Sequence, residues 1–170
     1  GGVDAEKPVS DAAVAATDGM VVMYAGKVIS TPYFSTCGGS TAYTHEVWYN
    51  EADQPYLKPV SDRIPGTDRF YCDPSPRFRW PSNFTGESLR AVLEKYLSAY
   101  TTAPKGSVGR VTGVYEQGRT ESDRVAALRV EADRGSYVLR GNDISVVLRS
   151  PNGEMLISTY FPAEATITRS

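Results

Sequence analysis

The strongest β-strand signal in the chain comes from three runs: VGRVTGVYEQ at residues 108–117, RVAALRVEA at 124–132 and SYVLR at 136–140. Apolar and polar side chains alternate along them, as in strands that have one face in the core and one face in water. We therefore expect an antiparallel sheet in the second half of the chain.

The clearest helix is TGESLRAVLEKYLSAY, residues 85–100, with Thr85 as its N-cap. Its apolar residues recur at helical spacing and predict one stripe that faces the core: Leu89, Val92, Leu93, Tyr96, Leu97 and Tyr100. The sequence thus predicts an α+β fold, mostly antiparallel β, with one main amphipathic helix.

Other elements are expected on either side of this region. Ser10 should cap a helix over residues 11–17 that Gly19 ends, and residues 20–30 should form a hairpin with its turn at Ala25–Gly26. The second arm should continue to Phe34. Residues 50–82, rich in proline, glycine and charge, should be one long irregular segment. A helix over 141–149, capped by Asn142, and a last strand over 154–162 complete the expected elements.

Length and composition narrow the class of protein. A chain of 170 residues, 41% hydrophobic and 22% charged, fits one globular domain over residues 1–170. Its net charge of −2 gives no basic surface for nucleic acid, so no nucleic-acid partner is expected. No apolar run approaches the ~20 residues of a membrane span, so no transmembrane segment is expected.

The stretch YFSTCGGSTAYTHEVW, residues 33–48, holds the most reactive-looking residues. Cys37 and His45 would be a nucleophile and its base, but no third group marks the pair. Cys37, His45 and Cys72 would offer three metal ligands, but zinc sites usually take two ligands from one tight turn. The glycines lack the spacing of a phosphate-binding loop. We therefore expect no metal and no cofactor here.

Carboxyl groups and the second cysteine leave further alternatives open. Paired carboxylates for glycoside chemistry would come from Glu46, Glu51, Asp53, Asp62 and Asp68. Two cysteines 35 positions apart are either a disulfide, typical of an oxidising compartment, or two separate thiols.

Residues 13–48 and the run PYLKPVSD at 55–62 together resemble the stage II sporulation protein D and LytB amidase-enhancer family. That family's pattern is AVxxTxGxVxxYxGxxIxxxYxSxxxGGxT, then VW, then YLxxVxD. The matching residues are Ala13, Val14, Thr17, Gly19, Tyr24, Gly26, Ile29, Tyr33, Ser35, Gly38, Gly39, Thr41, Val47, Trp48, Tyr56, Leu57, Val60 and Asp62.

The likeness extends over nearly the whole chain. The run CDPSPRFRW at 72–80 is similar to a C-x-x-SP-x-x-x-W segment of members whose glycine loop also has a cysteine, which implies a Cys37–Cys72 disulfide that pins the long loop. The runs at 122–149 and LISTYF at 156–161 resemble the family's C-terminal strands, with their SGRV and ST-x-F motifs. Asp123, Ser145 and Ala42 depart from the pattern.

The resemblance implies a function outside the cytoplasm, in a secreted or envelope-associated protein. The family cleaves peptidoglycan glycan strands as lytic transglycosylases, with a glutamate as acid and base. That glutamate belongs to an N-terminal segment which the run at 1–14 would follow, so we expect it upstream of Gly1 and expect the chain alone to be inactive. The alternative is a non-catalytic module that binds peptidoglycan or enhances a cell-wall amidase, with such an envelope enzyme as its partner.

The same resemblance implies which residues bind the glycan. The glycine loop and the YLK run would line the cleft, Tyr33 and Trp48 would offer flat faces to sugars, and Lys58 would donate to a developing oxygen charge. The complete expected set is Tyr33, Ser35, Thr36, Gly38, Gly39, Ser40, Thr41, Trp48, Tyr56, Lys58 and Asp62.

Overall fold

A computed structural model describes residues 6–150 and 152–162 and has two compact units, Gly1–Tyr33 and Phe34–Ser170. The fold is mixed α+β with antiparallel strands in two small sheets, as the sequence predicts. The single domain over residues 1–170 that the sequence leads us to expect stays a prediction. Among the described residues, no helix combines the length and apolar character that a membrane crossing requires.

The first unit consists of α1 (Pro8–Ala16) and a hairpin. The helix begins at Pro8 rather than at Asp11, because Pro8 occupies its first turn and the Ser10 hydroxyl accepts a hydrogen bond from the Lys7 backbone N–H, 3.3 Å away. Ser10 therefore caps from inside the first turn. No residue of α1 is buried.

The hairpin pairs β1 (Met23–Tyr24) with β2 (Lys27–Val28). Its turn is at Ala25 and Gly26 as predicted, and both have positive φ, +47° and +77°, as a two-residue hairpin turn requires. The prediction that the second arm continues to residue 34 is wrong, because the paired residues end at Val28. Pro32 has no N–H with which to extend the ladder.

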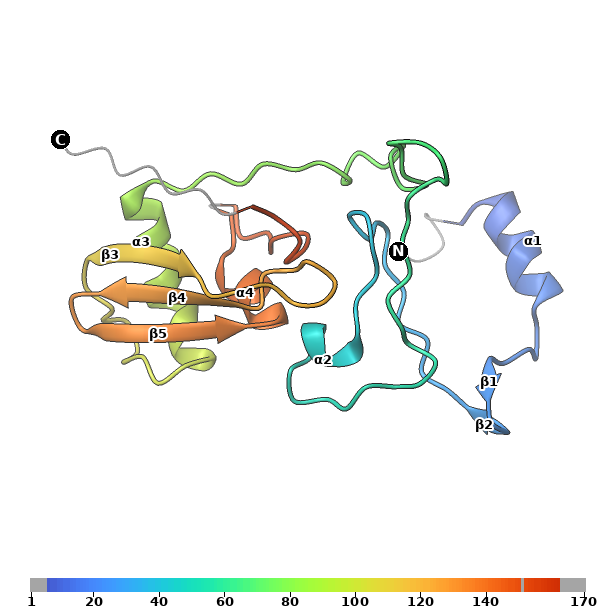
Figure 1. Ribbon diagram of the computed structural model, residues 1–170, viewed down its shortest axis with the longest axis horizontal. Helices are drawn as coiled ribbons and strands as arrows, with labels where there is room; N and C mark the ends of the chain where they lie inside the picture. The colour runs from blue at the N-terminus through green and yellow to red at the C-terminus, as the bar shows by residue number, and fades with distance from the viewer. Residues whose placement is uncertain (1–5, 151, 163–170) are drawn as a thin grey trace. The chain divides into compact units, whose positions relative to one another are not determined.

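The second unit contains the sheet that the sequence predicts (Figure 1). Its strands β3 (Val111–Glu116), β4 (Ala127–Ala132) and β5 (Gly135–Arg140) are antiparallel, with β4 in the centre. The register places Leu128 of β4 opposite Leu139 of β5, and both side chains are buried. This sheet supplies one layer of the core.

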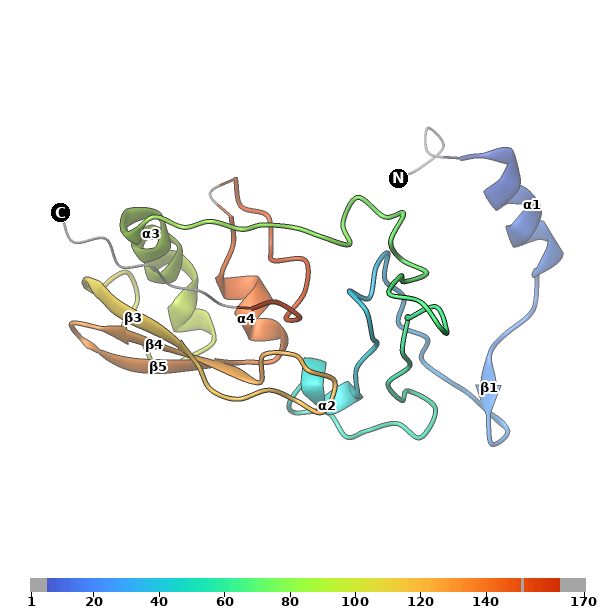
Figure 2. The same cartoon turned by 45° about the horizontal axis from the view of Figure 1, so that its top comes forward.

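Two helices supply the other layer. Helix α3 (Gly86–Tyr96) begins at Thr85, whose hydroxyl accepts the Ser88 N–H at 3.1 Å, as predicted. Helix α4 (Asn142–Val147) lies on the same face of the sheet as α3 (Figure 2), and Gly141 rather than Asn142 is its N-cap residue. The buried cluster between the layers contains Leu93, Leu97, Ala103, Val108, Val125, Leu128, Val130, Tyr137, Leu139, Ile144, Val147, Leu148 and Leu156.

The rest of the second unit has little regular structure. Residues 50–82 are turns and isolated bridges, as expected, and one short helix, α2 (Thr44–Val47), precedes them. The prediction of a strand over 154–162 is wrong. Thr159 accepts one hydrogen bond from the Val125 N–H at 2.9 Å, but no ladder forms around this contact.

Candidate functional site

The glycine loop is held by backbone pairing with residues 60–62. The Thr41 N–H donates to the Val60 carbonyl and the Asp62 N–H donates to the Gly39 carbonyl, each at 3.0 Å. On the other side of Asp62, its carbonyl accepts the Tyr71 N–H at 3.0 Å. Asp62 thus lies between the loop that carries Cys37 and the segment that carries Cys72.

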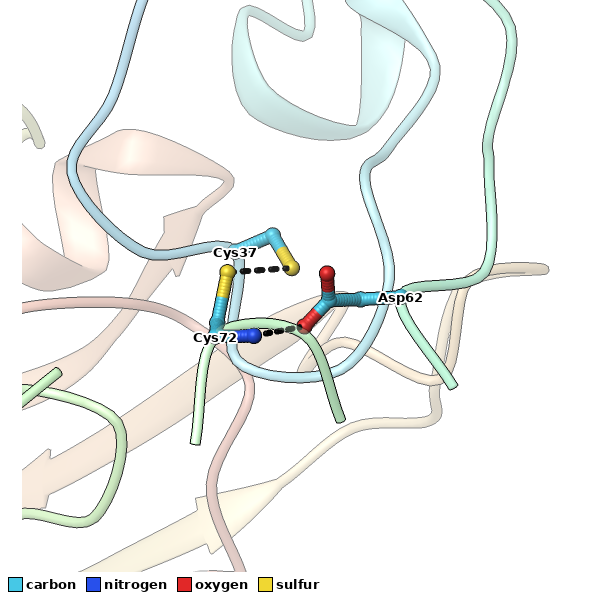
Figure 3. A group of neighbouring side chains, drawn as sticks. All are labelled: Cys37, Asp62 and Cys72. Atoms are coloured by element: carbon cyan, nitrogen blue, oxygen red, sulfur yellow. Dashed lines mark hydrogen bonds between the residues drawn. The ribbon is translucent and has the colours of Figure 1, made fainter. Parts of the chain in front are cut away.

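This pairing brings Cys37, Asp62 and Cys72 together (Figure 3). We call them the Cys–Asp cluster. The two Sγ atoms are 3.8 Å apart, and an Asp62 carboxylate oxygen accepts the Cys72 N–H at 3.0 Å. Cys37 is buried, whereas Asp62 and Cys72 are half-buried. The three residues come from distant parts of the chain, and the backbone pairings together with the hydrogen bond from the Cys72 N–H to Asp62 make them neighbours.

The expected Cys37–Cys72 disulfide is not formed in the structure. Both residues are free cysteines, and a sulfur–sulfur bond requires a separation of about 2 Å. The long loop is therefore held by hydrogen bonds, one of them between the Thr36 and Ser75 hydroxyls at 2.6 Å, and not by a covalent bond.

The environment of Cys37 does not favour a nucleophile. Burial raises its pKa to about 11, and the neighbouring Cys72 and Asp62 add to this effect, while the Gly39 N–H opposes it. At neutral pH the unliganded side chain is a thiol, which is a poor nucleophile. His45 does not contact it: the His45 Nδ1 atom lies 2.8 Å from a carboxylate oxygen of Asp53.

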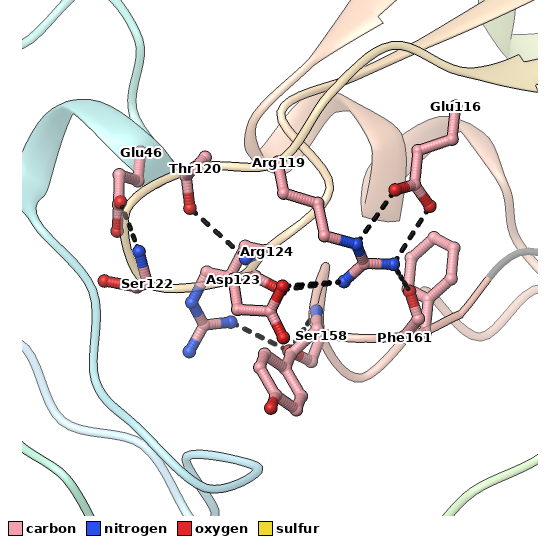
Figure 4. Close-up of polar contacts among 10 residues, drawn as sticks. Glu46, Glu116, Arg119, Thr120, Ser122, Asp123, Arg124, Ser158 and Phe161 are labelled. Carbon is pink, nitrogen blue, oxygen red and sulfur yellow. Dashed lines mark hydrogen bonds and ion pairs between the residues drawn. The ribbon is translucent and has the colours of Figure 1, made fainter.

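Arg124 anchors the glycine loop to the rest of the unit. Figure 4 shows its contact with Ser158 and the neighbouring contact of Ser122 with Glu46. The Arg124 guanidinium donates to the carbonyls of Cys37 at 3.2 Å and Ser40 at 2.8 Å, and to the Ser158 hydroxyl at 2.9 Å. The residue is only 8% exposed. Burial lowers its pKa, and the negative charge of Glu46 acts in the opposite direction. One buried cation thus joins three segments that are far apart in sequence.

Glu46 makes a second anchor. Its carboxylate accepts the Tyr43 N–H within its own turn and the Ser122 N–H from the segment before β4, both at 3.0 Å. Burial alone would raise the pKa of Glu46, but hydrogen bonds from Ser122, Thr120 and Tyr43 outweigh burial and lower it. The group is therefore a carboxylate at neutral pH and holds α2 in place.

Asp53 is the other carboxyl group near the loop with a shifted pKa. Hydrogen bonds from the backbone and ring of His45 lower its pKa. A general acid needs a raised pKa, so neither Glu46 nor Asp53 has the electrostatic character of one. The sequence did not reveal the contact between Glu46 and the Ser122 N–H, because the two residues are 76 positions apart.

The structure brings together part of the expected glycan-binding set. Thr36, Gly38, Gly39, Ser40 and Thr41 form the loop. The Thr41 hydroxyl donates to the Lys58 carbonyl at 3.3 Å and accepts the Val60 N–H at 2.7 Å. Backbone pairing brings the Lys58–Asp62 segment against this loop.

The other expected residues are not joined to the loop by the contacts described above. Trp48 follows α2 and is 45% exposed, Tyr56 is half-buried, and Ser35 is exposed. Tyr33 belongs to the first unit, where its side chain is 97% exposed. A hollow of about 380 Å³ lies at the turn that contains the Arg63–Asp68 ion pair, and the glycine loop does not line it.

A family model described as a domain of unknown function, DUF8618, matches residues 64–168, more than half of the chain. The chain belongs to the DUF8618 family. The matched region includes Cys72, Arg124 and the buried core, whereas Cys37 and Asp62 precede it. Comparisons with curated proteins and with solved structures found no match to this chain. The description of the DUF8618 family names no activity, so a function has to be inferred from the site itself.

Proposed function

We propose that this chain binds the glycan strands of peptidoglycan, outside the cytoplasm, through the glycine loop and the segment paired with it. The observation that carries the proposal is the set of contacts made by Arg124. It comes from the run that resembles SGRV, and it binds two carbonyls of the glycine loop and the serine of the run that resembles ST-x-F. Motifs that occur together in one family are thus in direct contact here.

Exposed aromatic residues in the segment that contains the loop support a carbohydrate ligand. Phe34, Trp48, Tyr49 and Tyr71 are 58%, 45%, 46% and 65% exposed, all within the segment that contains the loop and its partners. Aromatic faces suit the apolar faces of sugar rings, while the polar edges of tyrosine and tryptophan meet water and hydroxyl groups. A polar ligand with flat apolar faces therefore suits these exposed side chains.

Within a lytic transglycosylase, this chain would bind and orient the glycan. Glu46 and Asp53 have lowered pKa values and are already engaged in hydrogen bonds, so the proposal gives neither of them the role of the acid. The second candidate is a non-catalytic module that binds peptidoglycan and assists a cell-wall amidase.

The test is a binding measurement with purified peptidoglycan. The chain should sediment with insoluble peptidoglycan and not with cellulose. Soluble glycan-strand fragments should shift the NMR signals of residues 35–41. Trp48→Ala and Tyr71→Ala should each weaken binding about threefold to tenfold, the usual contribution of an aromatic contact.

Tyr115→Ala is the matched control, because this tyrosine of β3 is similarly exposed, at 44%, but belongs to the sheet. Its affinity should equal that of the unchanged chain. Absence of sedimentation, or NMR shifts confined to residues 108–140, would refute the proposal. Incubation with glycan strands should release no anhydro-muropeptides, and such release would contradict a binding-only role.

A further inference from the structure

We propose that the Cys–Asp cluster binds one zinc ion, with the thiolates of Cys37 and Cys72 and the carboxylate of Asp62 as ligands. This differs from the sequence-based expectation of no metal, and it does not depend on glycan binding. The ligand atoms of the three residues all lie within 4.8 Å of one another. The fourth position of the ion would hold water or an oxygen of a bound molecule.

The spacing of the sulfur atoms fits a tetrahedral zinc site. Zinc–sulfur bonds are about 2.3 Å long, so two thiolates on one tetrahedral ion lie about 3.8 Å apart. The Sγ atoms of Cys37 and Cys72 are 3.8 Å apart. The two sulfur–oxygen edges of such a site are about 3.6 Å long. The Asp62 oxygen lies within 4.8 Å of both sulfur atoms, so each of these distances has to shorten by about 1.2 Å at most.

Backbone N–H groups support two of the ligands. The Gly39 N–H points at the Cys37 sulfur, 3.5 Å away, and the Cys72 N–H donates to the Asp62 carboxylate at 3.0 Å. Such hydrogen bonds to ligand atoms orient them and tune a bound metal. The turn that aims the Gly39 N–H requires glycine, because Gly38 and Gly39 have φ of +77° and +125°.

The charge around the cluster also suits a divalent ion. Two thiolates and a carboxylate carry three negative charges, and a zinc ion neutralises two of them. The buried guanidinium of Arg124 donates to the Cys37 carbonyl at 3.2 Å, so a positive charge lies beside the cluster and is shared with the Glu46 carboxylate. Thiolate ligands select zinc over magnesium and calcium, which prefer oxygen ligands alone.

The test uses the whole chain, kept reduced with a phosphine and free of metal at the start. Calorimetric titration should show one zinc ion bound per chain. Cobalt added in place of zinc should give the thiolate-to-metal charge-transfer absorption and the visible bands of a tetrahedral site. Zinc should also raise the melting temperature, because it binds the folded chain.

Variants identify the ligands. Cys37→Ser and Cys72→Ser should each weaken zinc binding at least about 100-fold, and Asp62→Asn at least about tenfold, since even second-shell changes cost about 10–100-fold. His45→Ala is the control and should bind zinc as the unchanged chain does, because His45 pairs with Asp53 instead. Circular dichroism checks that each variant is folded.

Two results of the metal titrations would overturn the proposal, and a third result would assign the two cysteines to a disulfide instead. One is a reduced, folded chain that gives no cobalt–thiolate absorption, and this measurement stands even where a cysteine variant fails to fold. The other is zinc affinity that is unchanged in Asp62→Asn and in the Cys37→Ser, Cys72→Ser double variant. A Cys37–Cys72 linked peptide in chain purified without reductant, together with no zinc binding after reduction, would assign the pair to a disulfide.

Discussion

Replacing Arg124 by methionine tests whether one buried cation holds the glycine loop. The change keeps the apolar stem and removes the donors to the Cys37 and Ser40 carbonyls and to the Ser158 hydroxyl. A hydrogen bond from a charged donor contributes about 1.5–3 kcal/mol. The three do not simply add, because removing the buried guanidinium also removes the cost of its dehydration. Buried acceptors left without a donor cost about 1–3 kcal/mol, and we expect a loss of about 2–4 kcal/mol for the two loop carbonyls together.

Two measurements distinguish a loss of stability in the loop from a loss of stability in the core. Urea denaturation gives the free energy of unfolding, and hydrogen exchange reports single amides. In Arg124→Met, the Thr41 and Asp62 amides, which donate to the Val60 and Gly39 carbonyls, should exchange much faster than in the unchanged chain. Amides of β4 should keep relatively more of their protection, since the sheet retains its own ladder.

Arg90→Met is the matched control. Arg90 is an exposed arginine of α3 that pairs with Glu94, and such surface pairs contribute only about 0–1 kcal/mol. If Arg124→Met lost no more free energy of unfolding than Arg90→Met, and the Thr41 and Asp62 amides kept their protection, the loop would not depend on this cation and the reasoning would fail.

Three further predictions follow from single residues. Glu46→Gln should lower the free energy of unfolding by about 1–3 kcal/mol at pH 7, because the amide cannot accept both N–H groups. Since the pKa of Glu46 is lowered in the folded chain, this difference should shrink as the pH falls below about 4, which acid titrations of stability measure. Asp123, at φ +56°, should tolerate glycine within about 0.5 kcal/mol and lose at least about 1 kcal/mol as valine, by thermal denaturation. Leu93→Ala should cost about 2–5 kcal/mol in urea, against less than about 0.5 for Val9→Ala, since Leu93 is fully buried and Val9 is 83% exposed.

Local patterns predicted most of the second unit's regular elements. The alternation in β3, β4 and β5 and the helical stripe of α3 are set by neighbours a few positions away, so the sequence alone reveals them. The expected strand over 154–162 has the same composition but forms no ladder. Its described backbone contact with the sheet region is a single bond between Val125 and Thr159, which no local pattern reports.

The candidate site was harder to predict because its contacts are long-range. Arg124 lies 84 and 87 positions from the carbonyls of Ser40 and Cys37, and two separate backbone pairings bring Asp62 to the cysteines. Asp123 is a partial exception. Its position is a glycine in the family that the sequence resembles, and its positive φ gives a physical reason for glycine there.

These contacts distinguish the residues that give the loop its shape from the residues that a ligand would contact. The motif residues Gly38, Gly39 and Arg124 shape the loop: the glycines adopt positive φ, and Arg124 is buried among loop carbonyls. A sequence pattern made of such residues is evidence for the loop architecture on which the proposed glycan site rests, and it does not by itself choose the ligand. The side chains of Trp48 and Lys58 are exposed, and under the proposed function they would contact the glycan. Variants of these exposed residues, rather than further matches to the motif, therefore carry the weight in testing glycan binding.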